Sequence, residues 1–478
     1  MSNLSKLLAL VLVFAFLTSS MSATVKATSS GGWSMFRSDP AHSGIGTENS
    51  TANSLLTPTQ LWKTNITFPS ISLPSQWPQT IIPSKQRVLT EPSVVDGIVY
   101  VGANSRADYW QYDLGFWIDV YALNATNGAV IWDYRDNTCH TVTPPAVVNG
   151  TVYFATEHYT CALRASDGYL LWNFSAGTFV SYPTVVQNIL FIGSGEGSEG
   201  TLLALNATSG QSIWNFTNIV NSRSFSTPAV TNGLVYVGSF DENMYALNMF
   251  TGQKIWSYPA GDFHPAPAVA NKIVYGITSE ANIYALDATQ GTKIWNYSIY
   301  DGGDTAQQPY FAISNGVLYA RNGLNKLYAL NAVSGNKIWI RTFESSLYQG
   351  ISAPTVVNSV VYLGSDTGIY ALNANNGENV WNYSTDSSFG APVVFNSVLY
   401  GTSNEQVYAI QIPSSTLEPN RESMLIENSS IVLAVTFLIV IAVISLLLYR
   451  RHRKPAMKHT ILTETALSEK STSNRTFA

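Results

Sequence analysis

Short apolar runs alternate with turn-forming residues along most of this chain. In YALNATNGAVIW (121–132), one apolar run ends at Asn124, Gly128 follows, and a second run leads to Trp132. Runs of β-branched and aromatic residues bounded by Gly, Asn and Asp predict short strands, because Gly and Asn adopt the positive φ of tight turns at little cost. The pattern therefore predicts an all-β protein.

The Gly-to-Trp unit occurs seven times, at intervals of 39 to 44 residues, and each copy places a Trp four residues after a Gly. The glycines are Gly128, Gly168, Gly210, Gly252, Gly291, Gly335 and Gly377. The tryptophans are Trp132, Trp172, Trp214, Trp256, Trp295, Trp339 and Trp381. A period of about 42 residues holds about four short strands, which is the size of one β-propeller blade.

A second phrase marks the inner strands of each unit. It reads PSVVDGIVYVG at position 92 and occurs eight times in varied form, once more than the Gly-to-Trp unit. The eighth unit ends at 407–412 without a Trp strand, whereas Trp62, in QLWKTN (60–65), lies upstream of the first complete unit. We therefore predict an eight-bladed propeller, in which an N-terminal strand completes the last blade and leaves no open sheet edge.

The repeated tryptophans are interpreted as structural. Each lies on the outermost strand of a blade, where its ring can stack on the glycine peptide of a neighbouring turn, and an aromatic side chain buries roughly 150–250 Å². The Asn or Asp that opens each turn can bond its own backbone. These residues are Asn124, Asn206, Asn248, Asp287, Asn331 and Asn373, and Arg164 is the exception.

The repeated A-x-[DN]-x-x-x-G-x-x-x-W pattern resembles the PQQ-like β-propeller repeat family. The segment WSMFRSDPAHSG (33–44) is similar to the lead-in often found there. That family includes quinoprotein dehydrogenases and the β-barrel-assembly lipoprotein of bacterial outer membranes. The resemblance covers about residues 33–412 and implies the propeller fold, but a fold does not by itself imply one function.

Resemblance to the quinoprotein enzymes implies pyrroloquinoline quinone (PQQ) held with a calcium ion, beside a disulfide between adjacent cysteines. Here the two cysteines are 22 positions apart, and the sequence contains no CxxCH haem motif and no Asp-rich calcium loop. The chain is therefore expected to be closer to the non-enzymatic scaffold members. We expect no cofactor, no metal and no catalytic residue, with PQQ and calcium as the alternative.

Both ends of the chain resemble targeting and anchoring segments. Residues 1–27 contain LLALVLVFAFL, which is typical of a signal peptide. Residues 431–449 form an uncharged stretch long enough for a transmembrane helix, and the basic RRHRK that follows favours a cytoplasmic end. The prediction is a single-pass type I protein of the cell membrane, with a propeller (31–412) outside the cytoplasm, a stalk (413–430) and a cytoplasmic tail (450–478).

The charge balance excludes nucleic acid as a partner. Between the leader and the predicted span, the chain carries 16 Lys and Arg against 28 Asp and Glu. Recognition of nucleic acid starts from a basic surface, which this acidic region does not provide. The expected partner is instead a protein, a glycan or another envelope component, in addition to the membrane.

Two long segments that do not repeat are the candidate binding loops. In the usual propeller wiring, they fall on the face where the outer strand of one blade connects to the inner strand of the next. They are 68–90 and 104–117, and the second contains Tyr109, Trp110, Tyr112, Phe116 and Trp117. Two interpretations stay open, because these aromatic residues could fold down as a plug over the central channel or form a recognition patch.

Cys139 and Cys161 are the only cysteines, and both lie in the part predicted to be exported. A disulfide between them is favoured, because disulfides persist outside the cytoplasm. Two alternatives stay open, namely two free thiols, or a metal site that also uses His140, Glu157 and His158.

The sequence thus favours a non-catalytic, membrane-anchored propeller outside the cytoplasm that binds a protein or an envelope component. Spacing alone assembles no Ser-His-Asp triad and no carboxylate pair. The alternative function is a PQQ- or metal-dependent oxidoreductase on the same fold. Among the Asn-x-Ser/Thr sequons, Asn428 in the stalk is the candidate for glycosylation.

Overall fold

The computed structural model describes most of the region between residues 57 and 413, all of it within the first compact unit of the chain, Met1–Thr416. The described ranges are 57–66, 84–109, 112–177, 179–196, 199–218, 225–263, 265–301, 309–322, 325–343 and 351–413.

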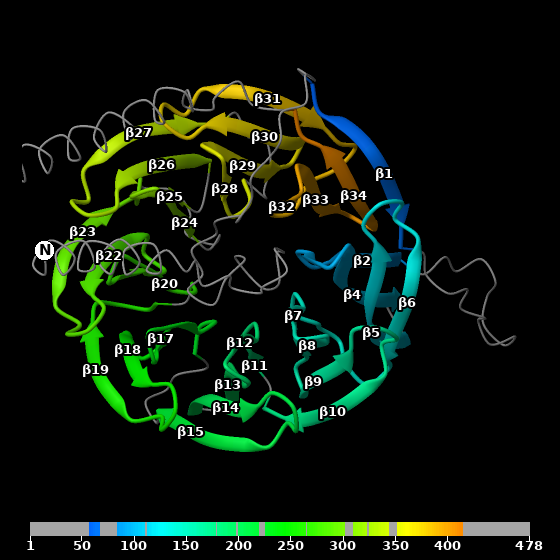
Figure 1. Ribbon diagram of the computed structural model, residues 1–478, viewed down its shortest axis with the longest axis horizontal. Helices are drawn as coiled ribbons and strands as arrows, with labels where there is room; N and C mark the ends of the chain where they lie inside the picture. Colours follow the sequence, from blue (N-terminus) through cyan, green and yellow to red (C-terminus); the bar gives the residue numbers. More distant parts are fainter. Residues whose placement is uncertain are drawn as a thin grey trace, which may run out of the picture. The chain divides into compact units, whose positions relative to one another are not determined.

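Eight antiparallel sheets are arranged in a ring (Figure 1). Each sheet is one blade, and its strands run from the channel outward in the order A, B, C and D. In blades 1 to 4 these strands are β3 (Ser93–Val95), β4 (Ile98–Tyr109), β5 (Tyr112–Asn124) and β6 (Val130–Asp136); β7 (Ala146–Val148), β8 (Thr151–Ala155), β9 (Tyr159–Arg164) and β10 (Leu170–Ser175); β12 (Thr184–Val186), β13 (Ile189–Glu196), β14 (Glu199–Asn206) and β15 (Ser212–Asn218); and β16 (Ala229–Thr231), β17 (Leu234–Gly238), β18 (Asn243–Asn248) and β19 (Lys254–Pro259).

The remaining blades follow the same order. In blades 5 to 8 the strands are β20 (Ala268–Ala270), β21 (Ile273–Ile277), β22 (Asn282–Asp287) and β23 (Lys293–Ser298); β24 (Tyr310–Ser314), β25 (Val317–Arg321), β26 (Lys326–Asn331) and β27 (Lys337–Thr342); β28 (Thr355–Val357), β29 (Val360–Ser365), β30 (Gly368–Asn373) and β31 (Asn379–Ser384); and β32 (Val393–Phe395), β33 (Val398–Ser403), β34 (Gln406–Gln411) and β1 (Thr59–Asn65). Two short strands are additional: β2 (Ser84–Leu89) pairs with β4, and β11 (Phe179–Val180) pairs with β13.

The ring is closed by the N-terminal strand, as the sequence predicts. Strand β1 pairs antiparallel with β34, and Trp62 stands opposite Ala409. The last blade therefore takes three strands from one end of the region and one from the other. This closure confirms the eight-bladed all-β fold, and it leaves no blade with a missing outer strand.

Two kinds of tight turn explain why each unit folds into a blade. The A-to-B turn needs positive φ at both central residues, as at Asn315 (φ 49°) and Gly316 (φ 75°), which is the signature of a hairpin turn. At the C-to-D turn the opening Asn side chain bonds its own backbone, and the Oδ1 of Asn124 accepts the N–H of Thr126 at 2.8 Å. The unit thus encodes its own turns.

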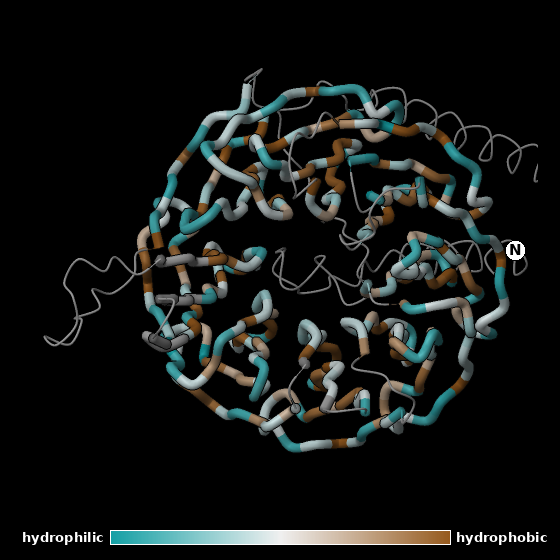
Figure 2. Tube along the Cα trace, turned by 180° about the vertical axis from the view of Figure 1, so that it is seen from behind, coloured by the Kyte–Doolittle hydropathy of each residue, from teal (hydrophilic) through white to brown (hydrophobic). Residues whose placement is uncertain are grey.

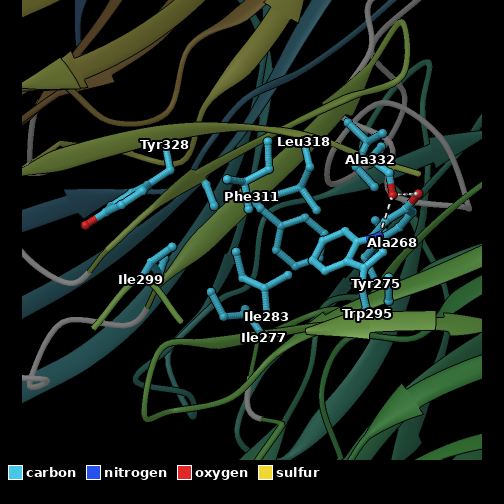
Figure 3. Close-up of a cluster of buried hydrophobic side chains, with 14 of the residues drawn as sticks. Ala268, Tyr275, Ile277, Ile283, Trp295, Ile299, Phe311, Leu318, Tyr328 and Ala332 are labelled. Atoms are coloured by element: carbon cyan, nitrogen blue, oxygen red, sulfur yellow. Dashed lines mark hydrogen bonds between the residues drawn. The ribbon is translucent and has the colours of Figure 1, made fainter. Parts of the chain in front are cut away.

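The hydrophobic core is divided among the interfaces between adjacent blades. The tube in Figure 2 shows hydrophobic positions concentrated within the blades, with hydrophilic positions frequent at the outer rim. Figure 3 shows one such cluster, in which Tyr275 and Trp295 of blade 5 pack beside Phe311 and Leu318 of blade 6. Similar clusters lie at six further interfaces, from blades 8 and 1 round to blades 4 and 5, and between blades 6 and 7.

Several predicted segments lie outside the described residues. They are the signal peptide (1–27), the stalk beyond residue 413, the span (431–449), the tail (450–478) and the Asn428 sequon. In the part of the chain that the structure does describe, no helix is long and apolar enough to cross a membrane.

Candidate functional site

The repeated tryptophans join each blade to the next. In seven of the eight, the indole N–H donates to a backbone carbonyl in the C-to-D turn of the following blade, at 2.8 to 3.0 Å. The pairs are Trp62 with Ala125, Trp132 with Ala165, Trp172 with Ala207, Trp214 with Met249, Trp256 with Ala288, Trp295 with Ala332, and Trp339 with Ala374. Trp62 makes the bond that connects the last blade to the first.

The repeated glycines are required by these rings. A Cβ at Gly291 would lie 2.5 Å from the ring of Trp256, and one at Gly335 would lie 2.7 Å from the ring of Trp295. Both glycines have φ between 71° and 73°, where L side chains are rare. The repeated Gly and Trp residues therefore have structural roles in the packing of adjacent blades.

An aromatic residue on strand B is a partner that sequence reasoning missed. Tyr275 packs against Trp295 with ring centroids 6.0 Å apart, and its hydroxyl donates to the same carbonyl of Ala332 (Figure 3). The ring contact between a strand B aromatic residue and the Trp of strand D occurs in all eight blades. The strand B residues are Tyr100, Tyr153, Phe191, Tyr236, Tyr275, Tyr319, Tyr362 and Tyr400. The signal was present in the repeated phrase, where an aromatic residue follows the turn at a fixed distance.

Blade 1 differs from the others on the face that carries the D-to-A and B-to-C connections. Segment 104–117 is predicted as a loop, but β4 and β5 continue through it as a long hairpin, in which Tyr109 stands opposite Tyr112. β2 adds a third strand beside β4, within the segment 68–90 that is also predicted as a loop. The two candidate loops therefore contain a three-stranded extension of the blade 1 sheet, formed by β2 and the outer parts of β4 and β5. Its strands are joined by regular backbone pairing.

The candidate aromatic residues occupy different parts of this extension. Trp117 is buried, with 8% of its surface exposed, so it belongs to the base of the hairpin. Tyr109, Tyr112 and Phe116 have backbone positions on the paired strands, and Trp110 lies outside the described residues. The choice between a plug and a recognition patch stays a matter for experiment.

A buried ion pair fixes the base of the extension. The carboxylate of Asp119 on β5 is fully buried and accepts a hydrogen bond from Nε of Arg135 on β6 at 2.6 Å. The hydroxyl of Tyr121 donates to the other carboxylate oxygen at 3.3 Å. The hydrogen bond to Asp119 raises the pKa of Arg135 above its usual value, so the guanidinium stays charged.

The disulfide predicted between Cys139 and Cys161 is not formed in the structure, where both residues are buried free thiols. Both lie in the apolar interface between blades 1 and 2, and the Sγ of Cys139 instead bonds the hydroxyl of Thr156 at 3.3 Å. Burial raises the pKa of both thiols, that of Cys161 to about 12, so neither is a reactive thiolate at neutral pH.

The polar residues near these thiols hold a loop in place. The carboxylate of Glu157 accepts hydrogen bonds from the backbone N–H of His140 and from the N–H and hydroxyl of Thr141. Burial acts to raise the pKa of Glu157, but these hydrogen bonds hold it below its usual range. Across the described residues, no three His, Cys, Asp or Glu side chains are grouped so that they could hold a metal ion.

An axial pocket lies on the same face, and the sequence did not indicate it. Its volume is about 230 Å³, and it is lined from blades 6, 7, 8 and 1 by Tyr310, Arg321, residues 351–353, Ser365, Asp366, residues 388–391 and Glu91. These residues lie at or just before the start of strand A, or at or just after the end of strand B, so the ring brings them together on one face.

The pocket has a buried cation and two carboxyl groups. Arg321 has only 7% of its surface exposed, and its guanidinium lies over the ring of Tyr310, 5.1 Å from the centroid. Burial lowers the pKa of Arg321 and raises the pKa of Asp366. The Oδ2 of Asp366 is buried and has no hydrogen-bond partner among the described residues.

Comparison with protein families is decisive for classification. The family model described as "Outer membrane protein assembly factor BamB" matches residues 118–262 and 279–423, which is more than half of the chain. The chain belongs to this family. The sequence-based identification of a PQQ-like propeller repeat is thereby confirmed.

Individual relatives include an outer membrane assembly factor. The outer membrane protein assembly factor BamB of Moranella endobia is 29% identical over 160 residues, which cover 30% of this chain and 40% of that protein. The chain thus spans about two fifths of the length of this curated relative. The crystal structure of BamB from Moraxella catarrhalis superposes with a TM-score of 0.51 at 18% identity, covering 62% of this chain and 94% of that one.

An enzyme shares the same architecture. The quinohemoprotein alcohol dehydrogenase of Comamonas testosteroni superposes with a TM-score of 0.61 at 16% identity, covering 83% of this chain and 82% of that one. At this identity the likeness concerns the fold alone. The enzymatic status of the chain is therefore open between the two kinds of relative.

The residues of the axial pocket do not fit the quinone of the enzymes. PQQ is a three-ring quinone with three carboxylates, and pockets for ligands of comparable size measure about 300–1,000 Å³. The axial pocket measures about 230 Å³, and among its lining residues Arg321 alone carries a permanent positive charge. A calcium ion would also need several oxygen ligands, and the described residues provide no group of three acidic side chains.

Proposed function

We propose that the protein is a non-catalytic scaffold, anchored in the membrane with its propeller outside the cytoplasm, which binds a protein or an envelope component through the face that carries the blade 1 extension. Membership of a family named for an outer membrane assembly factor supports the scaffold function. The anchor is proposed from the uncharged segment 431–449 and the basic residues that follow it.

The blade 1 extension is the observation that carries this proposal. Its strands β4 and β5 have 12 and 13 residues, whereas the equivalent strands of blade 5 have 5 and 6. The fold does not need this length, because blade 5 closes the same interfaces without it. Regular pairing holds the extension in a defined position, which lowers the entropy that a partner must overcome on binding.

Site-specific photo-crosslinking in intact membranes tests the proposal. We expect a photoreactive amino acid at Tyr112, on the extension, to capture a defined partner from the full-length protein in its native membrane. The matched control carries the same amino acid at Glu280, an exposed residue in the B-to-C turn of blade 5. The proposal predicts a discrete crosslinked band for Tyr112 that is absent for Glu280.

Two results would overturn the scaffold function. One is an equal pattern of crosslinks from both positions, because the extension would then have no special role. The other is uptake of PQQ with calcium by the purified full-length protein, accompanied by reduction of an artificial electron acceptor when an alcohol or a sugar is supplied. The second result would establish the oxidoreductase alternative.

A further inference from the structure

The outermost strands of four blades carry the same short sequence. In blades 2, 3, 5 and 7, the Trp of strand D is followed by Asn, then by Phe or Tyr, and then by Ser or Thr. The asparagines are Asn173 on β10, Asn215 on β15, Asn296 on β23 and Asn382 on β31. Figure 1 shows these four strands at separate places around the outer rim of the ring. Each sequence is an Asn-x-Ser/Thr sequon, which is an acceptor for N-linked glycans.

The alternation of the strand places both defining residues of each sequon on an exposed face, because successive side chains of a strand point to opposite faces. On β23, Asn296 and Ser298 are exposed, whereas Trp295 is buried and Tyr297 is half-buried. In the other three sequons the Asn and the Ser or Thr are also exposed, and the aromatic residue between them is half-buried. A glycan on the Asn would therefore displace no packed side chain.

The propeller fold does not require Asn at this position. The equivalent residues of blades 1, 4, 6 and 8 are Asp133, Ser257, Ile340 and Lys63, and all four are exposed. Among the described residues, the side-chain amides of the four rim asparagines make no hydrogen bond. The sequon at Asn124 differs, because its Oδ1 accepts the N–H of Thr126 and so holds the C-to-D turn. The rim sequons thus lack the structural explanation that the turn provides for Asn124.

The outer strands of these blades also need protection from association. Each strand D is the last strand of its sheet, so its outer backbone groups have no partner in that sheet. The residue two positions before each rim Asn is aliphatic and 39–47% exposed, namely Leu171, Ile213, Ile294 and Val380. Exposed apolar edges promote pairing between molecules, and natural proteins block it with charges or proline. Blades 1, 8 and 4 have Asp133, Lys63 and Pro259 on strand D. A bulky, hydrophilic glycan would have the same effect in blades 2, 3, 5 and 7.

We propose that Asn173, Asn215, Asn296 and Asn382 carry N-linked glycans, which cover the rim of the propeller. In the reaction, the amide Nδ2 forms a bond to the anomeric carbon of a lipid-phosphate-linked oligosaccharide. The bond from that carbon to the phosphate oxygen breaks, the lipid phosphate leaves with the bonding electrons, and one amide proton passes to a base of the membrane transferase. The modification rests on the proposed location outside the cytoplasm. It goes beyond the binding of a partner, because none of the four residues lies in blade 1.

Mass spectrometry of peptides from the full-length protein, purified from its native membranes, tests the proposal. We expect each of the four rim peptides to carry the added mass of a glycan in more than half of the molecules. Asn296→Gln should lower the mass of the intact protein by one glycan, whereas Ser298→Thr should retain it because Thr preserves the sequon. Unmodified asparagine at two or more of the four positions would overturn the proposal.

Blade 4 offers a matched pair of variants that tests the position itself. The double variant Ser257→Asn with Pro259→Ser gives its outer strand the same sequon, whereas Ser257→Asn alone leaves Pro259 in place and creates none. We expect one additional glycan in the double variant and none in the single variant. The circular dichroism spectrum confirms that both fold. A folded double variant without an additional glycan would contradict the assignment of the rim as the modified surface.

Labelling of intact cells separates failure of the modification from failure of the proposed location. A membrane-impermeant, amine-reactive biotin reagent should label Lys337, an exposed residue on the outer strand of blade 6, which has no rim sequon. Biotin on Lys337 together with unmodified rim asparagines would overturn the glycosylation and leave the location intact. Labelling only after the cells are broken, together with unmodified asparagines, would overturn both.

Discussion

Blades 1 and 5 share the same ring contacts and differ in everything beyond them. Trp132 in blade 1 and Trp295 in blade 5 make the same bond to the following turn, at 2.8 and 2.9 Å. Blade 5 stops at short strands, whereas blade 1 continues into a three-stranded extension with a buried ion pair at its base. The repeated residues therefore build the ring, which leaves the proposed recognition of a partner to residues that do not repeat.

Breaking a ring contact in the regular blade should have the largest effect on stability. Trp295→Ala removes a buried ring and its hydrogen bond to Ala332, and it should lower the free energy of unfolding by about 3–5 kcal/mol. Ile294→Ala is the matched control, because Ile294 is 47% exposed and should change stability by less than about 0.5 kcal/mol. Urea unfolding followed by tryptophan fluorescence measures the stability of both variants. Similar losses for the two would contradict the structural role of Trp295 in joining blades 5 and 6.

Breaking the ion pair in blade 1 should have a smaller effect. Arg135→Gln leaves the buried carboxylate of Asp119 without its cation and should cost about 2 kcal/mol, less than for a fully buried pair because Arg135 is partly exposed. Arg135→Lys should restore part of the loss. The same unfolding measurement checks this, and a stability unchanged by Arg135→Gln would show that the pair does not support the extension.

Lowering the pH should raise the free energy of unfolding through the protonation of Asp262. Burial, with a smaller contribution from Glu242, raises the pKa of this carboxyl to about 6, above its value in the unfolded chain. The folded state therefore binds the proton more tightly, and stability falls as the pH rises from about 4 through 6. Because the group is partly exposed, we expect the loss to be about 1 kcal/mol after solvent screening.

Asp262→Asn is the variant that isolates this effect. It should flatten the fall in stability between pH 4 and 6 and should be the more stable protein above pH 6. Urea unfolding at a series of pH values measures this difference. A slope that is unchanged in Asp262→Asn would assign the effect to another group.

The buried thiols should give the smallest response. Cys139 and Cys161 lie between blades 1 and 2 as free thiols, so iodoacetamide at pH 8 should label neither in the folded protein and both after unfolding without reductant. Mass spectrometry counts the labels. Absence of labelling after unfolding, with a gain of 2 Da on reduction, would instead establish the disulfide that the sequence favours.

The ring could be predicted from the sequence because its rules are local. In every copy the Gly occupies a tight turn and the Trp an outer strand, as Gly128 and Trp132 do in blade 1. Trp62, which has no complete unit around it in the sequence, indicated how the ring closes. The strand B aromatic residues, such as Tyr275, were visible in the repeat, but their contact with Trp295 is a tertiary one. Periodicity shows where such residues recur and does not show what they touch.

The parts that do not repeat were predicted less well. Segment 104–117 lacks a clear alternation of apolar and polar residues, so it indicated a loop, and pairing with β2 makes it a sheet. The axial pocket brings Glu91, Arg321 and Asp366 together only through closure of the ring. Two cysteines in a region predicted to be exported favoured a disulfide, because the spacing of residues does not show where their side chains point.

Removal of the blade 1 extension separates the stability of the ring from the capture of a partner. In this variant residues 106–116 are replaced by Asn-Gly, which forms a tight hairpin turn between Ser105 and Trp117, positions that are paired in the intact protein. Urea unfolding and capture of the membrane partner by chemical crosslinking are measured on the same preparation. We expect the free energy of unfolding to stay within about 1 kcal/mol of that of the intact protein while capture of the partner is lost; retained capture with a destabilised ring would contradict the proposed division between ring and extension.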